Sequence, residues 1–162
     1  MSTTTPTDVP IVTSLAPEAA STVAEALQPT LVELIELALT GKQLHWAVVG
    51  KRFKPVHEHL DELVEDYHEY ADMVAEYMST IGIIPDGRAV RVASDATMDP
   101  VEAAFLDDTA VIDLMTDRIK TVVTNVRERM PRVAQVDVAA EDLLIQVTRV
   151  LDKQLWMTSA QR

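Results

Sequence analysis

All four histidines of this 162-residue chain lie within 24 positions, from His45 to His68. Imidazole is the commonest metal ligand in proteins and the side chain that titrates near neutral pH, so the cluster indicates metal or proton chemistry. The residues that follow His57 have helical spacing, and side chains three or four apart on a helix share a face. One stripe of that helix, about 100° wide, carries only imidazoles and carboxylates: His57, Asp61, Glu65, His68, Asp72 and Glu76.

A polar stripe on a helix is more often a solvated face than a set of ligands. Two observations favour ligands in this chain. The span from His57 to Tyr77 contains no Lys or Arg, whereas a solvated face normally mixes both charges. The same span holds eight acidic residues, and their repulsion destabilises the helix unless a cation compensates it. His59 points to nearly the opposite side from His57, so it is not expected to be a ligand.

Two pairs in the stripe have i, i+4 spacing: His57 with Asp61, and Asp72 with Glu76. Asp61 and Asp72 are separated by about 16 Å along a helix, whereas a metal ion holds its ligands at about 2.0–2.6 Å. Each pair is therefore half of a site. Two copies of the helix lying antiparallel about a two-fold axis would join the unlike halves. With His45 from the preceding helix, the ligands are two imidazoles and three carboxylates, which suit iron or another divalent transition metal.

Apolar residues at three- and four-residue intervals predict two long helices in the first half of the chain. The first covers 17–49; Pro29 either kinks it or opens its main part, and Gly50 ends it. The second runs from Lys54 to Ile81, with Pro55 in its first turn. The histidine cluster thus occupies the end of one helix, a tight turn and the start of the next.

The second half of the chain predicts two more helices after a crossover at 83–98, which has room for a short helix. Asp99-Pro100 is expected to cap and open the third helix, which runs to Arg129. Pro131 then breaks the chain, and a fourth helix covers 137–158 with Asp137 as its cap. Alternation typical of strands is absent from the pattern. Four helices with one long crossover predict an all-α, ferritin-like four-helix bundle.

The chain has 26 acidic and 14 basic residues, a formal net charge of −12. Generic binding to nucleic-acid phosphates needs the opposite balance, so the charge favours metal cations as partners. Cysteine is absent, which excludes disulfides and thiolate chemistry. Neither a signal peptide nor a membrane-spanning run is recognisable, so we expect a soluble cytoplasmic protein. Residues 1–16 are expected to form a flexible tail before a single domain at 17–162.

The site residues resemble the motif of the Dps mini-ferritin family (DNA-binding protein from starved cells). The matching positions are His45-Trp46, Gly50, Phe53, His57, Asp61, Asp72 and Glu76, and LDKQLW at 151–156 is similar to the closing motif of the family. The resemblance implies a four-helix subunit that assembles as a hollow dodecamer with ferroxidase centres at its two-fold interfaces. His45, His57 and Asp61 would come from one subunit, and Asp72 and Glu76 from its partner.

The implied reaction is oxidation of Fe(II), preferably by hydrogen peroxide and otherwise by oxygen, followed by storage of ferric mineral in the cavity. Two electrons from two irons reduce peroxide to water without releasing hydroxyl radical, which would protect the cell and its DNA from oxidative damage. Trp46 is expected to pack the site, and the alternative is that it intercepts stray oxidising equivalents.

Two further groups of residues have open roles. Family pores for iron entry are lined by acids at the start of the last helix. Asp142 is similar to these acids, with Asp137 and Glu141 nearby, and all three would also complement the helix dipole. Glu65 and His68 lie outside the family motif, and the chain has no second Glu-x-x-His helix to complete a centre within one subunit. Near the two-fold axis they would form either an accessory metal position or a hydrogen-bond network.

Many Dps proteins bind DNA through basic tails, and this chain departs from that pattern. Its first basic residue is Lys42, and the four C-terminal residues include one Arg. Twelve chains of −12 each would carry −144, which opposes direct DNA binding. DNA binding through divalent-cation bridges or through local arginine clusters stays open. The alternative function is therefore a nucleoid-associated, DNA-protecting particle whose metal site is mainly structural.

Overall fold

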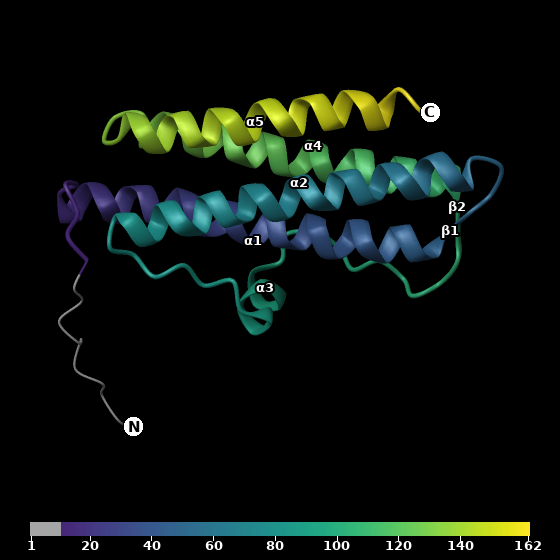
Figure 1. The fold of residues 1–162 in the computed structure, drawn as a ribbon, viewed down its shortest axis with the longest axis horizontal. Coiled ribbons are helices and arrows are strands. Elements are labelled where there is room, and N and C mark those ends of the chain that lie inside the picture. Colours follow the sequence, from purple (N-terminus) through teal and green to yellow (C-terminus); the bar gives the residue numbers. More distant parts are fainter. Residues whose placement is uncertain (1–10) are drawn as a thin grey trace.

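The computed structural model describes residues 11–162 as a bundle of four long helices lying side by side (Figure 1). A short helix lies in the crossover between the second and third long helices, and two short strands meet at one end of the bundle (Figure 1). The predicted all-α bundle with its long crossover is confirmed. The elements in chain order are α1 (Pro17–Ala47), β1 (Val48–Val49), α2 (Phe53–Thr80), α3 (Ala89–Asp95), β2 (Leu106–Asp107), α4 (Asp108–Val133) and α5 (Val138–Ser159).

The core lies along the bundle axis, where the apolar faces of the four long helices meet. Leu44, Leu60, Met115 and Leu144, one from each long helix, are at most 2% exposed. Burying such a side chain contributes about 1.5–3 kcal/mol, so the repeated apolar positions hold the helices together. The same packing fixes which face of α2 points outward, and that outward face carries the polar stripe.

One charged group is buried between α1 and α4. The Glu33 side chain is fully buried and accepts hydrogen bonds from Arg129 Nη1 at 2.5 Å and Arg129 Nη2 at 2.9 Å. Asn125 Nδ2 donates to the same carboxylate at 2.7 Å. A buried carboxylate needs such partners, and α4 supplies them here.

The start of α4 was predicted wrongly. The helix begins at Asp108 rather than at Asp99-Pro100, and Asp107 is its cap, with a carboxylate that accepts from Thr109 N at 2.9 Å. Residues 96–105 instead extend the crossover along the bundle, where the Asp99 carbonyl accepts from Arg118 Nη2. The longer crossover is needed because β2 must reach β1 at the far end of the bundle. A short helix within the crossover was expected, and α3 confirms it.

Proline disrupts the helices less than its type suggests. The prediction that Pro131 breaks the chain is wrong, because α4 continues through it to Val133. Pro131 lies in the last turn, where Ala134 N still bonds to Met130 O, so the helix loses one hydrogen bond and ends shortly afterwards. Helix α1 is likewise continuous through Pro29.

The two strands were not predicted, because each has only two residues and cannot show alternation. They pair in parallel, with Val48 opposite Leu106 and Val49 opposite Asp107. The pairing ties the turn between α1 and α2 to the start of α4. Gly50 follows β1 with a φ of 127°, a conformation that favours glycine.

The predicted tail is described only in part. Residues 1–10 lie outside the described residues, 11–14 are exposed, and Leu15 packs against the core. Among residues 11–162, no helix has the length and apolar character that crossing a membrane requires.

Candidate metal centre

The end of α1 and the first turns of α2 bring His45 and His57 into direct contact. Their imidazole rings stack with centroids 3.6 Å apart and planes inclined by 23°. His45 Nδ1 lies 3.0 Å from the backbone carbonyl of His57, and His57 Nδ1 lies 2.9 Å from the backbone carbonyl of His45. The tight turn at Gly50 makes this contact possible, because it folds α2 back along α1 within a few residues.

The two reciprocal hydrogen bonds determine which ring nitrogens are available to a metal. A carbonyl oxygen only accepts, so Nδ1 of each ring must carry the proton. In a neutral imidazole the other nitrogen, Nε2, then keeps its lone pair. A histidine held by one nitrogen on a carbonyl, with the other free, is the usual arrangement of a metal-ligating histidine. In both rings Nε2 is therefore the nitrogen that is available to a metal ion.

Asp61 lies one turn beyond His57 on α2 and completes a cluster with the two histidines. Its Oδ1 atom is 3.2 Å from His45 Nδ1 and 2.6 Å from Lys42 Nζ. The hydrogen bond from Lys42, together with the nearby His45, lowers the pKa of the Asp61 carboxyl. Sequence reasoning missed Lys42, although its position three residues before His45 places it on the same face of α1. The Lys42 ammonium group thus already occupies a position beside the Asp61 carboxylate.

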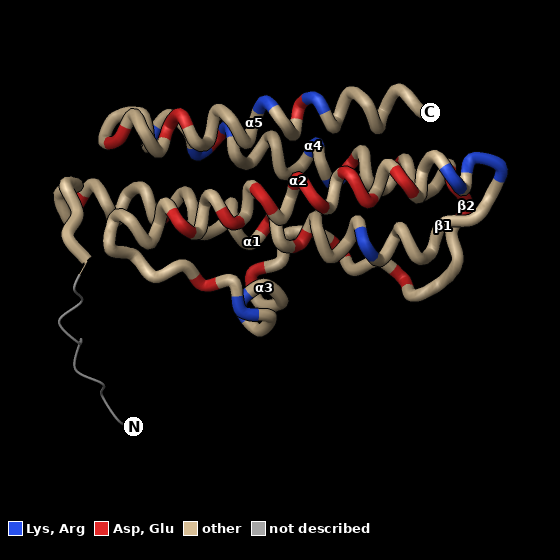
Figure 2. The backbone as a smooth tube through the Cα atoms, in the orientation of Figure 1, with Lys and Arg blue, Asp and Glu red and all other residues tan. Residues whose placement is uncertain are grey.

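The other two predicted ligands lie farther along α2. Asp72 and Glu76 are both exposed, and neither belongs to the cluster around His45. Within residues 11–162, no three His, Asp or Glu side chains of the single chain are placed to hold a metal ion. Carboxylates nevertheless follow α2 over most of its length, where Figure 2 shows acidic residues and few basic ones.

A groove between α1 and α2 adjoins the histidine cluster. It has a volume of about 450 Å³, and its lining includes Lys42, Trp46, Asp61, Glu65 and His68. The Trp46 side chain is 63% exposed, and Glu65 and His68 are also exposed. The two residues outside the family motif therefore share a surface with the histidine half of the site.

The acids at the start of α5 differ in how far they are engaged. Asp137 caps the helix by accepting from Ala139 N at 3.1 Å, as predicted, and its second oxygen accepts from the Tyr77 hydroxyl.

Asp142 is exposed and accepts from Gln146 Nε2 at 2.7 Å. A groove of about 360 Å³ between α2 and α5 is lined by both Asp142 and Glu76. Glu141 lies in the first turn of α5 and is partly exposed.

His59 lies away from the cluster, on the α5 side of α2. Its Nε2 atom is 3.1 Å from Thr158 Oγ1, and burial lowers the pKa of its imidazole. That His59 is not a ligand stays a prediction.

Comparisons with known proteins identify the family. Residues 24–162 match the family model of the ferritin-like domain. The DNA protection during starvation protein of Mycolicibacterium smegmatis is 35% identical over 151 residues, which cover 90% of this chain and 80% of that protein. The chain belongs to the Dps family of ferritin-like proteins. A second Dps relative, DNA protection during starvation protein 2 of Deinococcus radiodurans, is 35% identical over 84% of this chain, but the match spans just 56% of that protein's length.

Solved Dps structures share the fold. The tetragonal form of Mycobacterium smegmatis Dps superposes with a TM-score of 0.89 at 32% identity, covering 96% of this chain and 94% of that one. Dps from Microbacterium arborescens in its high iron form gives a TM-score of 0.88 at 29% identity, with 93% and 98% covered. The predicted resemblance to the Dps family is therefore confirmed.

Proposed function

We propose that this chain is a Dps-type ferroxidase that oxidises Fe(II) and stores the ferric product. The observation that carries the proposal is the His45–His57 pair, in which both Nδ1 protons are donated to carbonyls and both Nε2 atoms are left as ligands. The Asp61 carboxylate lies 3.2 Å from His45 Nδ1 and would supply a hard oxygen donor. Two imidazoles and carboxylates form a donor set that suits iron.

The proposed centre is shared between two copies of the chain. Asp72 and Glu76 lie on the same helix as Asp61, and Asp72 is eleven residues beyond it, which is about 16 Å along the helix. They therefore reach the histidine half only from a second copy of α2 that runs antiparallel about a two-fold axis. The span of α2 from His57 to Tyr77, which has eight acidic residues and no Lys or Arg, supports this arrangement, because bound cations would compensate the carboxylates of both chains. The assembly that follows is a homo-oligomer with the dimer as the site-forming unit and the family's dodecamer as the complete particle.

Iron is the substrate, and the protein residues bind it and hold it in place. Two Fe(II) ions each give one electron to hydrogen peroxide, which takes up two protons and leaves as two water molecules. The products are two Fe(III) ions, which hydrolyse and deposit as mineral in the cavity. Removing Fe(II) and peroxide together prevents hydroxyl-radical formation, and this chemistry is how the protein would protect DNA and the cell.

Iron entry belongs to the same proposal. Asp142 is exposed at the start of α5 and lines a groove together with Glu76, so we assign the entry path to this end of the bundle. Glu141 is its neighbour in the first turn of α5. Asp137 is a weaker candidate, because both of its carboxylate oxygens already accept hydrogen bonds. Glu65 and His68 line the groove beside Asp61. At the two-fold interface they would form either an accessory metal position or a hydrogen-bond network.

The test mixes Fe(II) and hydrogen peroxide with the purified oligomer under anaerobic conditions and follows ferric absorbance. The wild type should oxidise iron rapidly and keep the product in solution. The double variant His45→Ala with Asp72→Ala should be at least about tenfold slower, because it removes a ligand from each half of the site. Equal rates for both proteins would show that the centre is wrongly assigned. A stable monomer on size exclusion would remove the shared site altogether.

A further inference from the structure

The turn between the two histidines is held by a buried carboxylate on another helix. Asp108, the first residue of α4, is 5% exposed. Its Oδ2 atom accepts from the backbone N of Arg52 at 2.8 Å, and its Oδ1 atom accepts from Arg52 Nε at 3.0 Å and Arg52 Nη2 at 2.8 Å. One carboxylate thus holds both the backbone and the side chain of a single turn residue.

Arg52 immediately precedes α2, whose first residue is Phe53. It occupies the cap position of the helix, and its own side chain makes no capping hydrogen bond. The first backbone N–H groups of a helix lack partners within the helix, and Asp108 supplies one from outside. The Arg52 guanidinium also donates to Thr109 Oγ1 at 2.8 Å and to the Gln161 carbonyl near the C-terminus, which lies at the same end of the bundle (Figure 1). The start of α2 is therefore tied to α4 and to the end of α5.

Gly50 makes the close approach of Asp108 possible. A Cβ atom at this position would collide with Asp108 Oδ2, and the φ of 127° is unfavourable for other residues. The parallel pairing of Val48 with Leu106 and Val49 with Asp107 leads directly into this contact. The end of α1, the turn and the start of α4 therefore form one connected unit.

His57 lies five residues after Arg52 and receives its position from this unit. Phe53, the first residue of α2, places its ring 5.0 Å from the His57 ring. The reciprocal hydrogen bonds between His45 and His57 require the ends of α1 and α2 to keep a fixed separation. A displacement of α2 relative to α1 would lengthen the two bonds that fix the tautomers. Metal sites depend on such supporting contacts about as much as on the ligands themselves.

We propose that Arg52 and Asp108 are positioning residues of the metal centre, which hold the α1–α2 turn so that the paired His45 and His57 rings keep their Nε2 atoms available to metal. The inference rests on the proposed function, because it assumes that these histidines bind metal. Neither residue touches the ion, so their effect is transmitted through the backbone of the turn.

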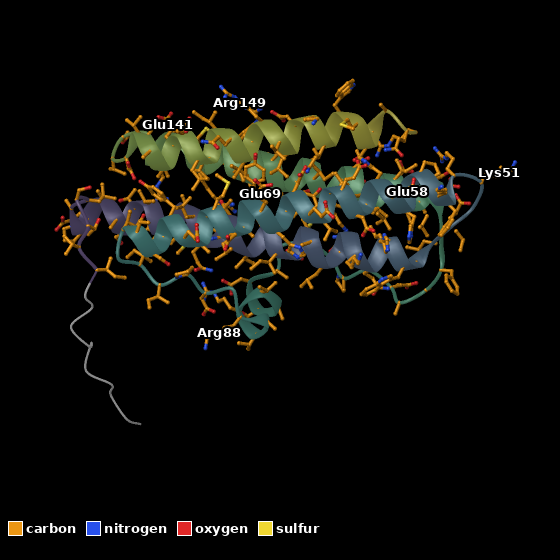
Figure 3. All side chains as sticks on the ribbon, viewed as in Figure 1. Lys51, Glu58, Glu69, Arg88, Glu141 and Arg149 are labelled. Atoms are coloured by element: carbon orange, nitrogen blue, oxygen red, sulfur yellow. The ribbon has the colours of Figure 1, made fainter. Side chains whose placement is uncertain are left out.

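The test uses Co²⁺ as a probe, titrated into the assembled protein and followed by its visible absorption. The variants are Arg52→Gln and Asp108→Asn, with Lys51→Gln as the matched control. Lys51 is the neighbouring residue of the same turn, but its side chain points away from the bundle (Figure 3). Positioning predicts that Arg52→Gln and Asp108→Asn each weaken Co²⁺ binding by about tenfold. Lys51→Gln should change it by less than about twofold.

Charge alone predicts a different pattern. Removing the positive charge of Arg52 should strengthen binding of a cation, and removing the negative charge of Asp108 should weaken it. Weaker binding in both variants therefore indicates geometry, whereas opposite changes would overturn the positioning role. Arg52→Lys, which keeps the positive charge and the backbone hydrogen bond to Asp108, should recover part of the affinity that Arg52→Gln loses. A Co²⁺ affinity of Arg52→Gln equal to that of Lys51→Gln would also overturn the positioning role.

The wild-type titration separates this inference from the proposed function. Co²⁺ binding by the wild type that His45→Ala abolishes supports the metal centre. With that binding present, normal affinity in both Arg52→Gln and Asp108→Asn removes only the positioning role. If the wild type shows no binding that depends on His45, the proposed function and the positioning role both fail.

Discussion

His45 and His57 face each other with their rings 3.6 Å apart, and each ring donates its Nδ1 proton to the backbone carbonyl of the other residue. The contact joins the last turn of α1 to the first turns of α2. It uses one nitrogen of each imidazole and leaves the second nitrogen of both as a metal ligand. Two histidines that are twelve residues apart in the sequence are thus held in contact before any metal binds.

His57→Ala should slow Fe(II) oxidation by at least about tenfold. It removes one proposed ligand and also the ring that stacks on His45. The matched control is His59→Ala, which lies two residues away and contacts Thr158 instead. Initial rates with hydrogen peroxide measure both. The assignment fails if the two variants lose activity to the same extent.

Lys42→Met should strengthen metal binding at neutral pH by up to about fivefold. Lys42 Nζ lies 2.6 Å from Asp61 Oδ1, so an incoming metal ion must displace it, and an exposed ion pair of this kind is worth about 1 kcal/mol or less. Calorimetric or Co²⁺ titration measures the change. Lys54→Met, which removes a lysine paired with Glu58 at the start of α2, controls for net charge.

The same substitution has a predicted pH signature. Lys42 is the largest cause that lowers the pKa of the Asp61 carboxyl. In Lys42→Met this pKa should rise, so protons compete with the metal from a higher pH downward. Metal affinity measured against pH should therefore begin to fall at a higher pH in the variant than in the wild type. If metal affinity falls at the same pH in the variant and in the wild type, the role assigned to Lys42 is wrong.

The hydrogen bond between Tyr77 and Asp137 predicts an effect in alkali. Burial and the hydrogen bond to the Asp137 carboxylate raise the pKa of Tyr77 to about 12. Because the folded value is above the ordinary value of about 10, the stabilisation is complete below about pH 10 and is lost as the pH rises through about 12. Asp137→Asn should lower the Tyr77 pKa, as measured by phenolate absorbance with Tyr77→Phe identifying the signal. An unchanged titration would show that the carboxylate does not act on Tyr77.

Periodicity predicted the bundle because each long helix has one apolar face. Residues such as Leu60 and Leu144 recur at helical spacing, and the structure buries them. Local chemistry also identified the Asp137 cap, whose acceptor role depends on its immediate neighbours. The family motif predicted the metal ligands, and that assignment stays a prediction; the structure places three of the named residues, His45, His57 and Asp61, near one another.

Features that depend on contacts between distant segments were not predictable in this way. The true start of α4 at Asp108 depends on pairing between β1 and β2, which are separated by more than fifty residues and have two residues each. Asp99-Pro100 had a better local signal for a helix start than Asp107, and tertiary pairing overrode it. The links from Lys42 to Asp61 and from Arg52 to Asp108 likewise join different elements, and no short motif marks them.

Complementation between two inactive variants tests the shared centre most directly. His57→Ala damages one half of the site and Asp72→Ala damages the other, so each variant alone should oxidise Fe(II) slowly. Coexpressed chains form mixed two-fold pairs in which one site carries both substitutions and the other carries neither. Random pairing makes about half of the pairs mixed, so about a quarter of all sites should be intact. Recovery of about a quarter of the wild-type rate is the predicted result, and a coexpressed assembly no faster than either variant alone would contradict a centre built from two copies of the chain.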